Sequence, residues 1–325
     1  MKSQIRCIVL IGLGSIGKRH LESLIKLKHK YNIYLIDKNL EALKFCKKKF
    51  CKDTNAHNLF FSNKMTNLPR FMDLAIIATT ADKRREVTEK LIYQASIKYV
   101  IFEKIVFQQV KDFKHIINLL KKKNIRSYVN FVRRAYPSYQ KLKKEVNKKP
   151  LAMSIKGNNW GMASNSFHYL DLLSYFIEEN KFYLVNSNLH KKIYKSKRNF
   201  FYEFGGKFTI KSSYGSTIVF QDNMIGKKKP SITIALKDKK ILINEEKNII
   251  NKFGNKKTQL VKEKKFKEIL QSNLTHRCVA KIFKNGKSEL PSLSESYLIH
   301  LPLIKLFNKH LFEVKKKSFL RYPIT

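Results

Sequence analysis

The segment Gly12-Leu13-Gly14-Ser15-Ile16-Gly17 constrains the fold of this chain more than any other feature of its sequence. It follows an apolar run that ends at Ile11 and precedes a stretch with helical spacing. The first glycine of such a turn permits the tight bend, the second lets a pyrophosphate approach the backbone, and the third lets the helix pack against the strand. Unpaired N–H groups at the helix N-terminus favour the phosphate anion. The motif predicts a dinucleotide site formed by Gly12, Gly14, Ser15, Ile16 and Gly17.

An acidic residue stands where such a site needs one. Asp37 follows the next predicted strand, Tyr31–Ile36, 20 residues after Gly17. A carboxylate in this place accepts hydrogen bonds from the ribose hydroxyls and repels a 2′-phosphate, which favours NAD over NADP. The adjacent Lys38 can offset that repulsion. Both Asp37 and Lys38 are therefore predicted to bind the cofactor, with NAD preferred and NADP as the alternative.

Strand-like and helix-like segments alternate through the first 125 residues, which predicts a doubly wound parallel sheet. Its further strands are expected at Leu74–Thr79, Tyr99–Phe102 and Ser127–Phe131, and its helices up to about Lys30 and at Leu40–Phe50, Lys83–Tyr93 and Asp112–Lys123. After Pro137 the pattern changes to helices at Ser138–Val146 and Ser164–Phe176, short β-rich runs, and closing helices at Leu274–Lys284 and Glu295–Phe312. Asp238-Lys239 indicates a hairpin, and Pro302 is expected to kink or divide the last helix.

These patterns predict an α/β protein with two domains. A Rossmann domain is expected over residues 1–126. An α+β domain with an open, mostly antiparallel sheet is expected over residues 127–325, where it would bind the substrate.

The formal net charge of +43 is spread along the chain, with +23 in residues 1–150 and +20 in residues 151–325. Lysine supplies 56 of the 67 basic residues, as expected for a lysine-rich composition with solvated ammonium groups on the surface. Such a field attracts polyanions, so a nucleic-acid binder is one alternative, but no zinc-finger, basic-zipper or RNP signature accompanies it. We expect no specific nucleic-acid partner and a preference for anionic substrates.

Cysteine use and hydropathy exclude other classes of protein. Four scattered cysteines form neither a disulfide framework nor a metal-binding pattern with histidine. No apolar stretch approaches the roughly 20 residues of a membrane span. We expect a cytoplasmic protein with no metal and no membrane partner.

Taken in order along the chain, the motifs resemble those of the Gfo/Idh/MocA oxidoreductases, which include glucose–fructose oxidoreductase and inositol dehydrogenase. The matching features are the glycine turn followed by His20, Ala78-Thr79-Thr80, Glu103-Lys104, an Arg-Arg-x-x-Pro segment and His168-x-x-Asp171. The resemblance covers essentially the whole chain. It implies that an open second-domain sheet covers the nicotinamide and joins copies of the chain into a homo-oligomer, and that Thr79, Thr80 and Glu103 belong to the cofactor site.

The resemblance also implies catalytic roles for Lys104 and His168. Burial beside a cationic nicotinamide would lower the pKa of a lysine towards the working range, and Ile105 stands where the family has proline. Active family members commonly carry Asp-x-Gly-x-His-x-x-Asp, but here Ser164 and Ser166 occupy the aspartate and glycine positions. Asp171, one helical turn after His168, is a candidate substitute. The alternatives are a surface lysine and a structural interfacial histidine.

Several polar residues of the expected second domain are candidates for binding the substrate. Arginine binds carboxylate or phosphate through two parallel hydrogen bonds, although an arginine that pairs the two domains is the alternative. The candidates are Asn130, Arg133, Arg134, Trp160, Asn165 and Asp171. We expect an NAD(P)-dependent dehydrogenase acting on the CH–OH group of an acidic sugar or nucleotide sugar, similar to members associated with surface-polysaccharide synthesis. The incomplete histidine motif leaves a non-catalytic dinucleotide-binding protein as the alternative.

Overall fold

The computed structural model describes residues 5–51, 57–196, 198, 200–254, 260–266, 268–317 and 321–324 of the 325-residue chain. The chain divides into two compact units, Met1–Val132 with Ile269–Ser294 and Arg133–Glu268 with Glu295–Thr325. The first unit thus contains a segment from late in the sequence as well as the N-terminal residues. All four cysteines are free, and no helix in the described ranges is long and apolar enough to cross a membrane.

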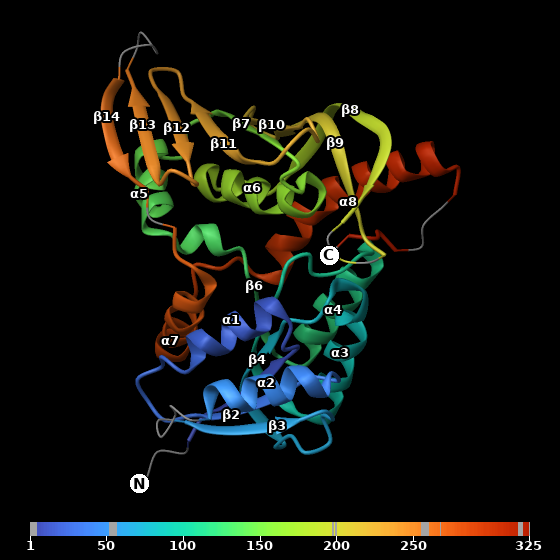
Figure 1. Cartoon of the computed structure of the whole chain (residues 1–325). Helices are drawn as coiled ribbons and strands as arrows, with labels where there is room; N and C mark the ends of the chain where they lie inside the picture. The colour runs from blue at the N-terminus through green and yellow to red at the C-terminus, as the bar shows by residue number, and fades with distance from the viewer. Residues whose placement is uncertain are drawn as a thin grey trace. The chain divides into compact units, whose positions relative to one another are not determined.

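The first unit contains a six-stranded parallel sheet with the order β3-β2-β1-β4-β5-β6 (Figure 1). Its strands are β1 (Cys7–Ile11), β2 (Asn32–Ile36), β3 (Asn58–Ser62), β4 (Phe71–Ile77), β5 (Ser96–Phe102) and β6 (Arg126–Val129). The central strands β1 and β4 are apolar and buried over Ile8–Ile11 and Leu74–Ile77, because helices cover both faces of such a sheet. The strand order reverses between β1 and β4, and ligands of doubly wound sheets bind at the carboxyl ends of the strands at this point.

The helices of this unit are α1 (Ser15–Leu24), α2 (Leu40–Phe50), α3 (Ala81–Gln94), α4 (Val110–Lys122) and, from the late segment, η2 (Gln271–Asn273) and α7 (Thr275–Asn285). Helix α2 has the predicted bounds because the Asn39 side chain accepts hydrogen bonds from the backbone N–H groups of Glu41 and Ala42 at 2.9 and 3.1 Å. The prediction that α1 extends to about Lys30 is wrong. The helical spacing continues past Leu24 only because Leu27, in the following turn, is also buried.

The second unit contains an eight-stranded mixed sheet with the order β14-β13-β12-β11-β7-β10-β9-β8. All neighbours are antiparallel except β7 and β10. The strands are β7 (Ala152–Asn158), β8 (Phe182–Lys195), β9 (Tyr202–Ser212), β10 (Thr217–Asp222), β11 (Lys228–Ala235), β12 (Lys240–Asn244), β13 (Ile249–Phe253) and β14 (Leu260–Lys265). The predicted fold class, a Rossmann domain followed by an α+β domain with a mostly antiparallel sheet, is confirmed.

Helices α5 (Pro137–Val146), α6 (Met162–Ile177) and α8 (Leu293–Lys315) accompany this sheet, and the 3-10 turn η1 (Val132–Ala135) precedes them. Helix α6 packs on β9 and β10 and is buried on nearly all sides. Phe307 of α8 stacks on Phe204 of β9 at 5.2 Å between ring centroids. These contacts form the core of the second unit.

Two of the finer predictions have opposite outcomes. The hairpin at Asp238-Lys239 is confirmed, because β11 and β12 pair antiparallel and Leu236 N–H donates to the Lys239 carbonyl at 2.9 Å. Of the two outcomes expected at Pro302, division of the last helix is wrong, since α8 continues through it, and a kink there stays a prediction. Buried neighbours such as Leu303 and Phe307 hold the helix in the core despite the missing N–H.

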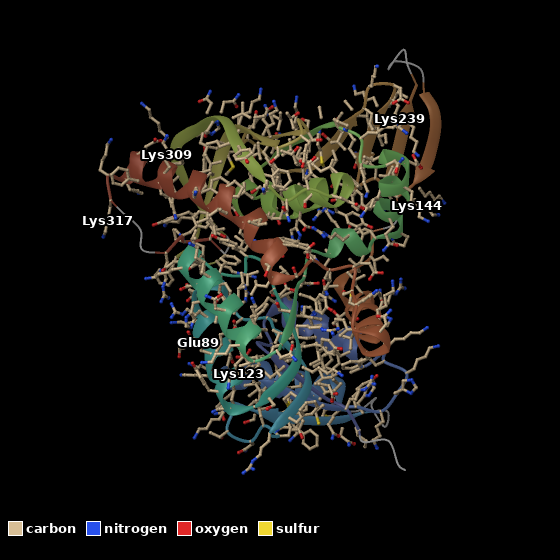
Figure 2. The ribbon with its side chains drawn as sticks, turned by 180° about the vertical axis from the view of Figure 1, so that it is seen from behind. Glu89, Lys123, Lys144, Lys239, Lys309 and Lys317 are labelled. Carbon is tan, nitrogen blue, oxygen red and sulfur yellow. The ribbon has the colours of Figure 1, made fainter. Side chains whose placement is uncertain are left out.

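Lysine side chains project from the surfaces of both units (Figure 2). Lys123 in the first unit and Lys144, Lys309 and Lys317 in the second are all exposed. The positive charge is therefore distributed over many separate surface positions.

Candidate functional site

The glycine turn joins β1 to α1, and the surroundings of each of its three glycines differ. Gly12 has a φ of +95°, and a Cβ there would lie 2.8 Å from the carbonyl carbon of Ala78. A Cβ on Gly17 would lie 1.8 Å from the carbonyl oxygen of Gly12, so the helix can approach the turn only with glycine at this place. Gly14 is different, because a Cβ there would meet nothing within 4 Å. The space beside Gly14 is open.

The N-terminus of α1 faces that open space, and no side-chain hydrogen bond caps it. Gly14 is the N-cap residue, no side chain caps the helix, and its first turn carries no acidic residue. Ser15 is exposed and Ile16 half-buried. A helix N-terminus of this kind favours an anion, through its free N–H groups and the helix dipole. The residues therefore fit the pyrophosphate of a dinucleotide.

Asp37 lies immediately after β2, beside the same turn. One of its carboxylate oxygens accepts the backbone N–H of Leu13 and the other accepts that of Asn39 at 2.8 Å. A carboxylate has about four acceptor positions, so two hydrogen bonds leave capacity for ribose hydroxyls. Lys38 is exposed. The arrangement fits the ribose-binding role predicted for Asp37.

The turn after β4 carries Thr79 and Thr80. The hydroxyl oxygen of Thr79 is buried and has no hydrogen-bond partner among the described residues. Thr80 is the N-cap residue of α3, but its side chain makes no capping hydrogen bond. Because β1 and β4 are adjacent, this turn and the glycine turn lie at the same edge of the sheet. An unpaired buried hydroxyl at that edge is a candidate contact for a ligand.

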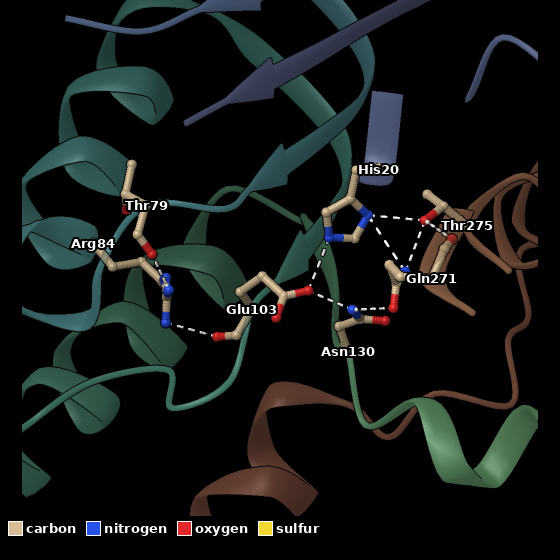
Figure 3. A network of polar contacts seen from close by, with 7 residues as sticks. All are labelled: His20, Thr79, Arg84, Glu103, Asn130, Gln271 and Thr275. Carbon is tan, nitrogen blue, oxygen red and sulfur yellow. Dashed lines mark hydrogen bonds and ion pairs between the residues drawn. The ribbon is translucent and has the colours of Figure 1, made fainter. Parts of the chain in front are cut away.

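A buried polar network follows β5 and connects three parts of the first unit (Figure 3). The Nε2 atom of His20 lies 2.8 Å from the Glu103 carboxylate, and the Asn130 amide donates to the same oxygen. Asn130 also donates to Gln271 at 3.0 Å, and Gln271 donates to the Thr275 hydroxyl at 2.8 Å. Thr275 closes the network through Nδ1 of His20, also at 2.8 Å. The network thus ties the end of β5 to α1 and to the late segment.

The Glu103 carboxyl is ionised within this network. Burial alone raises the pKa of a carboxyl group, but His20, Asn130 and the charge of Arg84 together hold the pKa of Glu103 below its ordinary value. An ionised carboxylate only accepts hydrogen bonds, so Nε2 of His20 carries the proton between them. Glu103 is therefore a fixed buried anion directly before Lys104.

Lys104 lies in the turn between β5 and α4, at the carboxyl edge of the sheet, and is half-buried. The peptide bond between Lys104 and Ile105 is cis. Arg84, from the first turn of α3, donates to the carbonyl groups of Glu103 and Val106 at 2.7 and 3.1 Å. Lys104 belongs to the first unit and His168 to the second.

His168 lies in the middle of α6 and is 9% exposed. Helix α6 begins at the left-handed Gly161, which provides no side-chain cap. The carboxylate of Glu203, from β9, accepts the N–H groups of Ala163 and Ser164 at 2.9 and 3.3 Å. A negative charge therefore lies against the backbone of position 164, where the side chain is a serine instead of the family's aspartate.

The two predicted arginines make ion pairs within the second unit, half-buried for Arg133 and buried for Arg134. Arg133 pairs with Glu245, with one contact at 2.8 Å, and its guanidinium lies 4.3 Å from the centre of the Tyr169 ring. Arg134 binds both carboxylate oxygens of Asp171 at 2.9 and 2.7 Å. Burial raises the pKa of Asp171 to about 6, although Arg134 opposes the shift. The ion pair between Arg134 and Asp171 therefore links η1 to α6.

The remaining candidates lie at the beginning of α6. The Trp160 indole donates to the Gln221 carbonyl at 3.0 Å, and its backbone N–H donates to Asp222 at 3.0 Å. The Asn165 side chain donates to the carbonyl groups of Trp160 and Gly161 at 3.0 and 3.1 Å. These hydrogen bonds fix the turn between β7 and α6.

Sequence reasoning missed several residues with a clear structural role at these sites. Arg84 resembles any other cation on a helical segment, and no local pattern distinguishes it. Glu203, Gln271 and Thr275 come from segments 39 to 255 positions away from their partners on other elements, and only the fold brings them together. A signal was available only for His20, which follows the glycine turn in the family pattern.

Comparison with known proteins supports the interpretation of the first unit. Residues 6–131 match the model of the Gfo/Idh/MocA family, described as an oxidoreductase family with an NAD-binding Rossmann fold. The match confirms the resemblance indicated by the sequence motifs. Comparison with proteins of curated function finds no match.

Solved structures share the fold of nearly the whole chain at low identity. The dehydrogenase MviM from Clostridium difficile is 16% identical with a TM-score of 0.73, over 94% of this chain and 100% of that one. UDP-N-acetylglucosamine 3-dehydrogenase GnnA from Acidithiobacillus ferrooxidans is 11% identical with a TM-score of 0.70, over 94% and 97%. The super-repressor mutant of Gal80p from Saccharomyces cerevisiae is 12% identical with a TM-score of 0.71, over 98% of both chains. At these identities the similarity establishes the fold alone.

Proposed function

We propose that this chain, whose residues 6–131 match the NAD-binding domain of the Gfo/Idh/MocA oxidoreductases, transfers a hydride between NAD(H) and a carbinol carbon of an acidic sugar or nucleotide sugar. The observation that carries the proposal is the open space beside Gly14, at a helix N-terminus without acidic residues and next to Asp37. Acidic sugars also suit the strongly positive charge of the chain, because such a field raises the local concentration of anions.

Each group at the carboxyl edge of the first sheet has a task in this proposal. The N–H groups of α1 hold the pyrophosphate, and Asp37 accepts hydrogen bonds from the adenosine ribose. NAD, when bound, supplies a nicotinamide ring that accepts or donates the hydride. Lys104 holds the proton that the substrate oxygen loses or gains. His168 is proposed as a second acid/base or as a ligand of the sugar.

The first experiment tests which dinucleotide binds and which class of sugar is the substrate. We would titrate the protein with NADH and NADPH by nucleotide fluorescence, and then follow NADH absorbance with a panel of sugars and nucleotide sugars. UDP-N-acetylglucosamine is the first member of the panel, because GnnA, which shares the fold, is named for it. Dinucleotide binding with turnover supports the proposal. Absence of any dinucleotide binding contradicts it.

A second candidate is a protein that binds a dinucleotide without turnover. It is favoured by Ser164 and Ser166, which replace the aspartate and glycine common in active family members. The super-repressor mutant of Gal80p, whose structure is solved, shares the fold. Tight NADH binding with no hydride transfer across the whole panel would support this candidate over the enzyme.

A further inference from the structure

Arg84 is an unusual residue for its position. It is 2% exposed, although arginine is seldom buried, and it lies in the first turn of α3, where the helix dipole disfavours a cation. A buried guanidinium is costly unless hydrogen bonds and an opposite charge compensate it. The charge of Arg84 contributes to lowering the pKa of Glu103, so the Glu103 carboxylate supplies the opposite charge.

The hydrogen bonds of Arg84 go to backbone carbonyl groups on two different turns (Figure 3). Its Nη1 atom donates to the carbonyls of Glu103, Ile105 and Val106, and its Nη2 atom donates to the carbonyl of Thr79. Glu103 and Ile105 are the residues on either side of Lys104. One side chain therefore connects the turn after β4 with the turn after β5 and fixes the backbone on both sides of Lys104.

We infer that Arg84 is a positioning residue that holds the Lys104 turn against the Thr79 turn, and so fixes where the Lys104 side chain begins. The inference rests on the proposed function, because Lys104 has a task only if the chain transfers protons. Arg84 acts through this turn and through no contact with substrate. The Glu103 network fixes the same turn from its other side, through His20 and Asn130.

The geometry of the side chain explains why arginine is needed. A guanidinium is planar and has five N–H donors in a fixed fork, so two of its nitrogens can serve two turns at once. A lysine ammonium is a single point charge with three donors and can reach one turn at a time. A glutamine keeps some length and a planar head but has one donor nitrogen and no charge.

The experiment compares Arg84→Gln and Arg84→Lys with Arg85→Gln as the control. Arg85 is the next residue of α3, is partly exposed and pairs with Asp112 at 2.8 Å, so its removal changes charge without affecting either turn. Backbone hydrogen exchange would be measured by mass spectrometry on the full chain, over residues 103–108 and 79–81. Acylation of Lys104 by acetic anhydride would be followed against pH, relative to the exposed Lys123. NADH affinity would be measured by fluorescence.

In Arg84→Gln we expect exchange to rise about tenfold or more in both turns, the ratio that follows from losing one hydrogen bond to a charged group. The pH profile of Lys104 acylation should differ from that of the wild type, while NADH affinity stays close to that of the wild type. Arg84→Lys should restore protection in one turn only. Arg85→Gln should match the wild type in all three measurements.

Unchanged exchange and unchanged Lys104 acylation in Arg84→Gln would overturn the inference and leave the proposed function intact. If Arg84→Gln does not fold, hydrogen exchange in Arg84→Lys tests the inference instead. A uniform rise of exchange over the whole first unit in that variant would show that Arg84 has a purely structural role. Loss of NADH binding with both turns still protected would also overturn the inference. The proposed function fails separately, if Lys104→Met turns over substrate as fast as the wild type while the exchange effect of Arg84→Gln persists.

Discussion

The carboxylate of Asp37 accepts the backbone N–H of Leu13, and this hydrogen bond joins the end of β2 to the glycine turn. The same carboxylate accepts the N–H of Asn39 at 2.8 Å. Asp37 therefore shapes the turn as well as offering acceptors to a ribose. A substitution must separate these two tasks.

The first prediction concerns the choice of cofactor. We expect the wild type to bind NADH more tightly than NADPH, because a 2′-phosphate would be repelled by the Asp37 carboxylate. Asp37→Ala should narrow the gap, and NADH affinity should fall about tenfold or more, since a hydrogen bond to a charged group contributes about 1.5–3 kcal/mol. Asp37→Asn keeps an acceptor oxygen for Leu13 while removing the charge, so it tests the repulsion alone. Wild-type preference for NADPH in the fluorescence titration would assign the control of cofactor choice to Lys38.

The sequence was sufficient wherever the relevant chemistry is local. The place of the glycine turn between β1 and α1, the position of Asp37 directly after β2 and the bounds of α2 depend on neighbouring residues and agree with the prediction, while cofactor binding there stays a prediction. By contrast, β3 was not predicted, because its residues are half-exposed and lack a clear alternation. Strand β8 was not delimited for a similar reason, since most of its residues are exposed at the sheet edge. Strands β13 and β14 were missed as well.

The polar groups of the candidate site illustrate the other limit. Asn130 was predicted to bind substrate, which stays a prediction, and the structure adds that its amide donates to Glu103 and Gln271. Arg134, a candidate of the same kind, pairs with Asp171. Polar side chains that bind a ligand and polar side chains that bind one another have the same sequence signature. Only the distances between segments far apart in the chain distinguish them.

The second prediction concerns the pH dependence of stability. The pKa of Glu103 in the folded protein lies below the unfolded value of about 4.3, so the unfolded chain binds the proton first as the pH falls. The stabilisation by ionised Glu103 is therefore complete above about pH 4.3 and is lost as the pH falls through the lowered folded pKa. Glu103→Gln should lower the free energy of unfolding at pH 7 by about 1.5–3 kcal/mol, and its difference from the wild type should shrink at acidic pH.

Denaturant unfolding of both proteins across the acidic range measures that difference. Glu86→Gln is the control, because Glu86 is fully exposed, pairs only at the surface with Lys90 at 2.9 Å, and should have little effect at any pH. A constant difference between Glu103→Gln and the wild type at all pH values would show that the Glu103 carboxyl is not the titrating group.

The third prediction concerns self-association through the second sheet. One row of residues crosses this sheet on the face opposite its buried core and contains no charged side chain, although the chain has 67 basic residues. The row is Thr209, Val219, Ser154, Thr233, Leu242 and Asn251, paired across neighbouring strands. All six are half-buried. An uncharged row of this kind suits a two-fold interface between copies of the chain.

We expect light scattering to give twice the chain mass for the wild type and the chain mass for Val219→Lys, which places a charge in the middle of that row. Tyr214→Lys is the control, since it adds the same charge in the exposed turn between β9 and β10. A monomeric wild type, or a dimer that survives Val219→Lys, would contradict the prediction.

The last prediction separates the enzyme from the non-catalytic dinucleotide-binding protein, through Lys104 and His168. Lys104→Met keeps similar bulk but removes the ionisable group, and general acid–base assistance typically contributes about 10²–10⁴-fold, so kcat should fall by that order. NADH affinity should change little, because the pyrophosphate is held by the glycine turn and the N-terminus of α1. His168→Ala should cost less, since Ser164 stands where active Gfo/Idh/MocA proteins commonly carry an aspartate. Stopped-flow absorbance with the best substrate of the panel measures both variants. Full activity of Lys104→Met would remove the lysine from the mechanism, and a total loss in His168→Ala would show that another carboxylate supports the histidine.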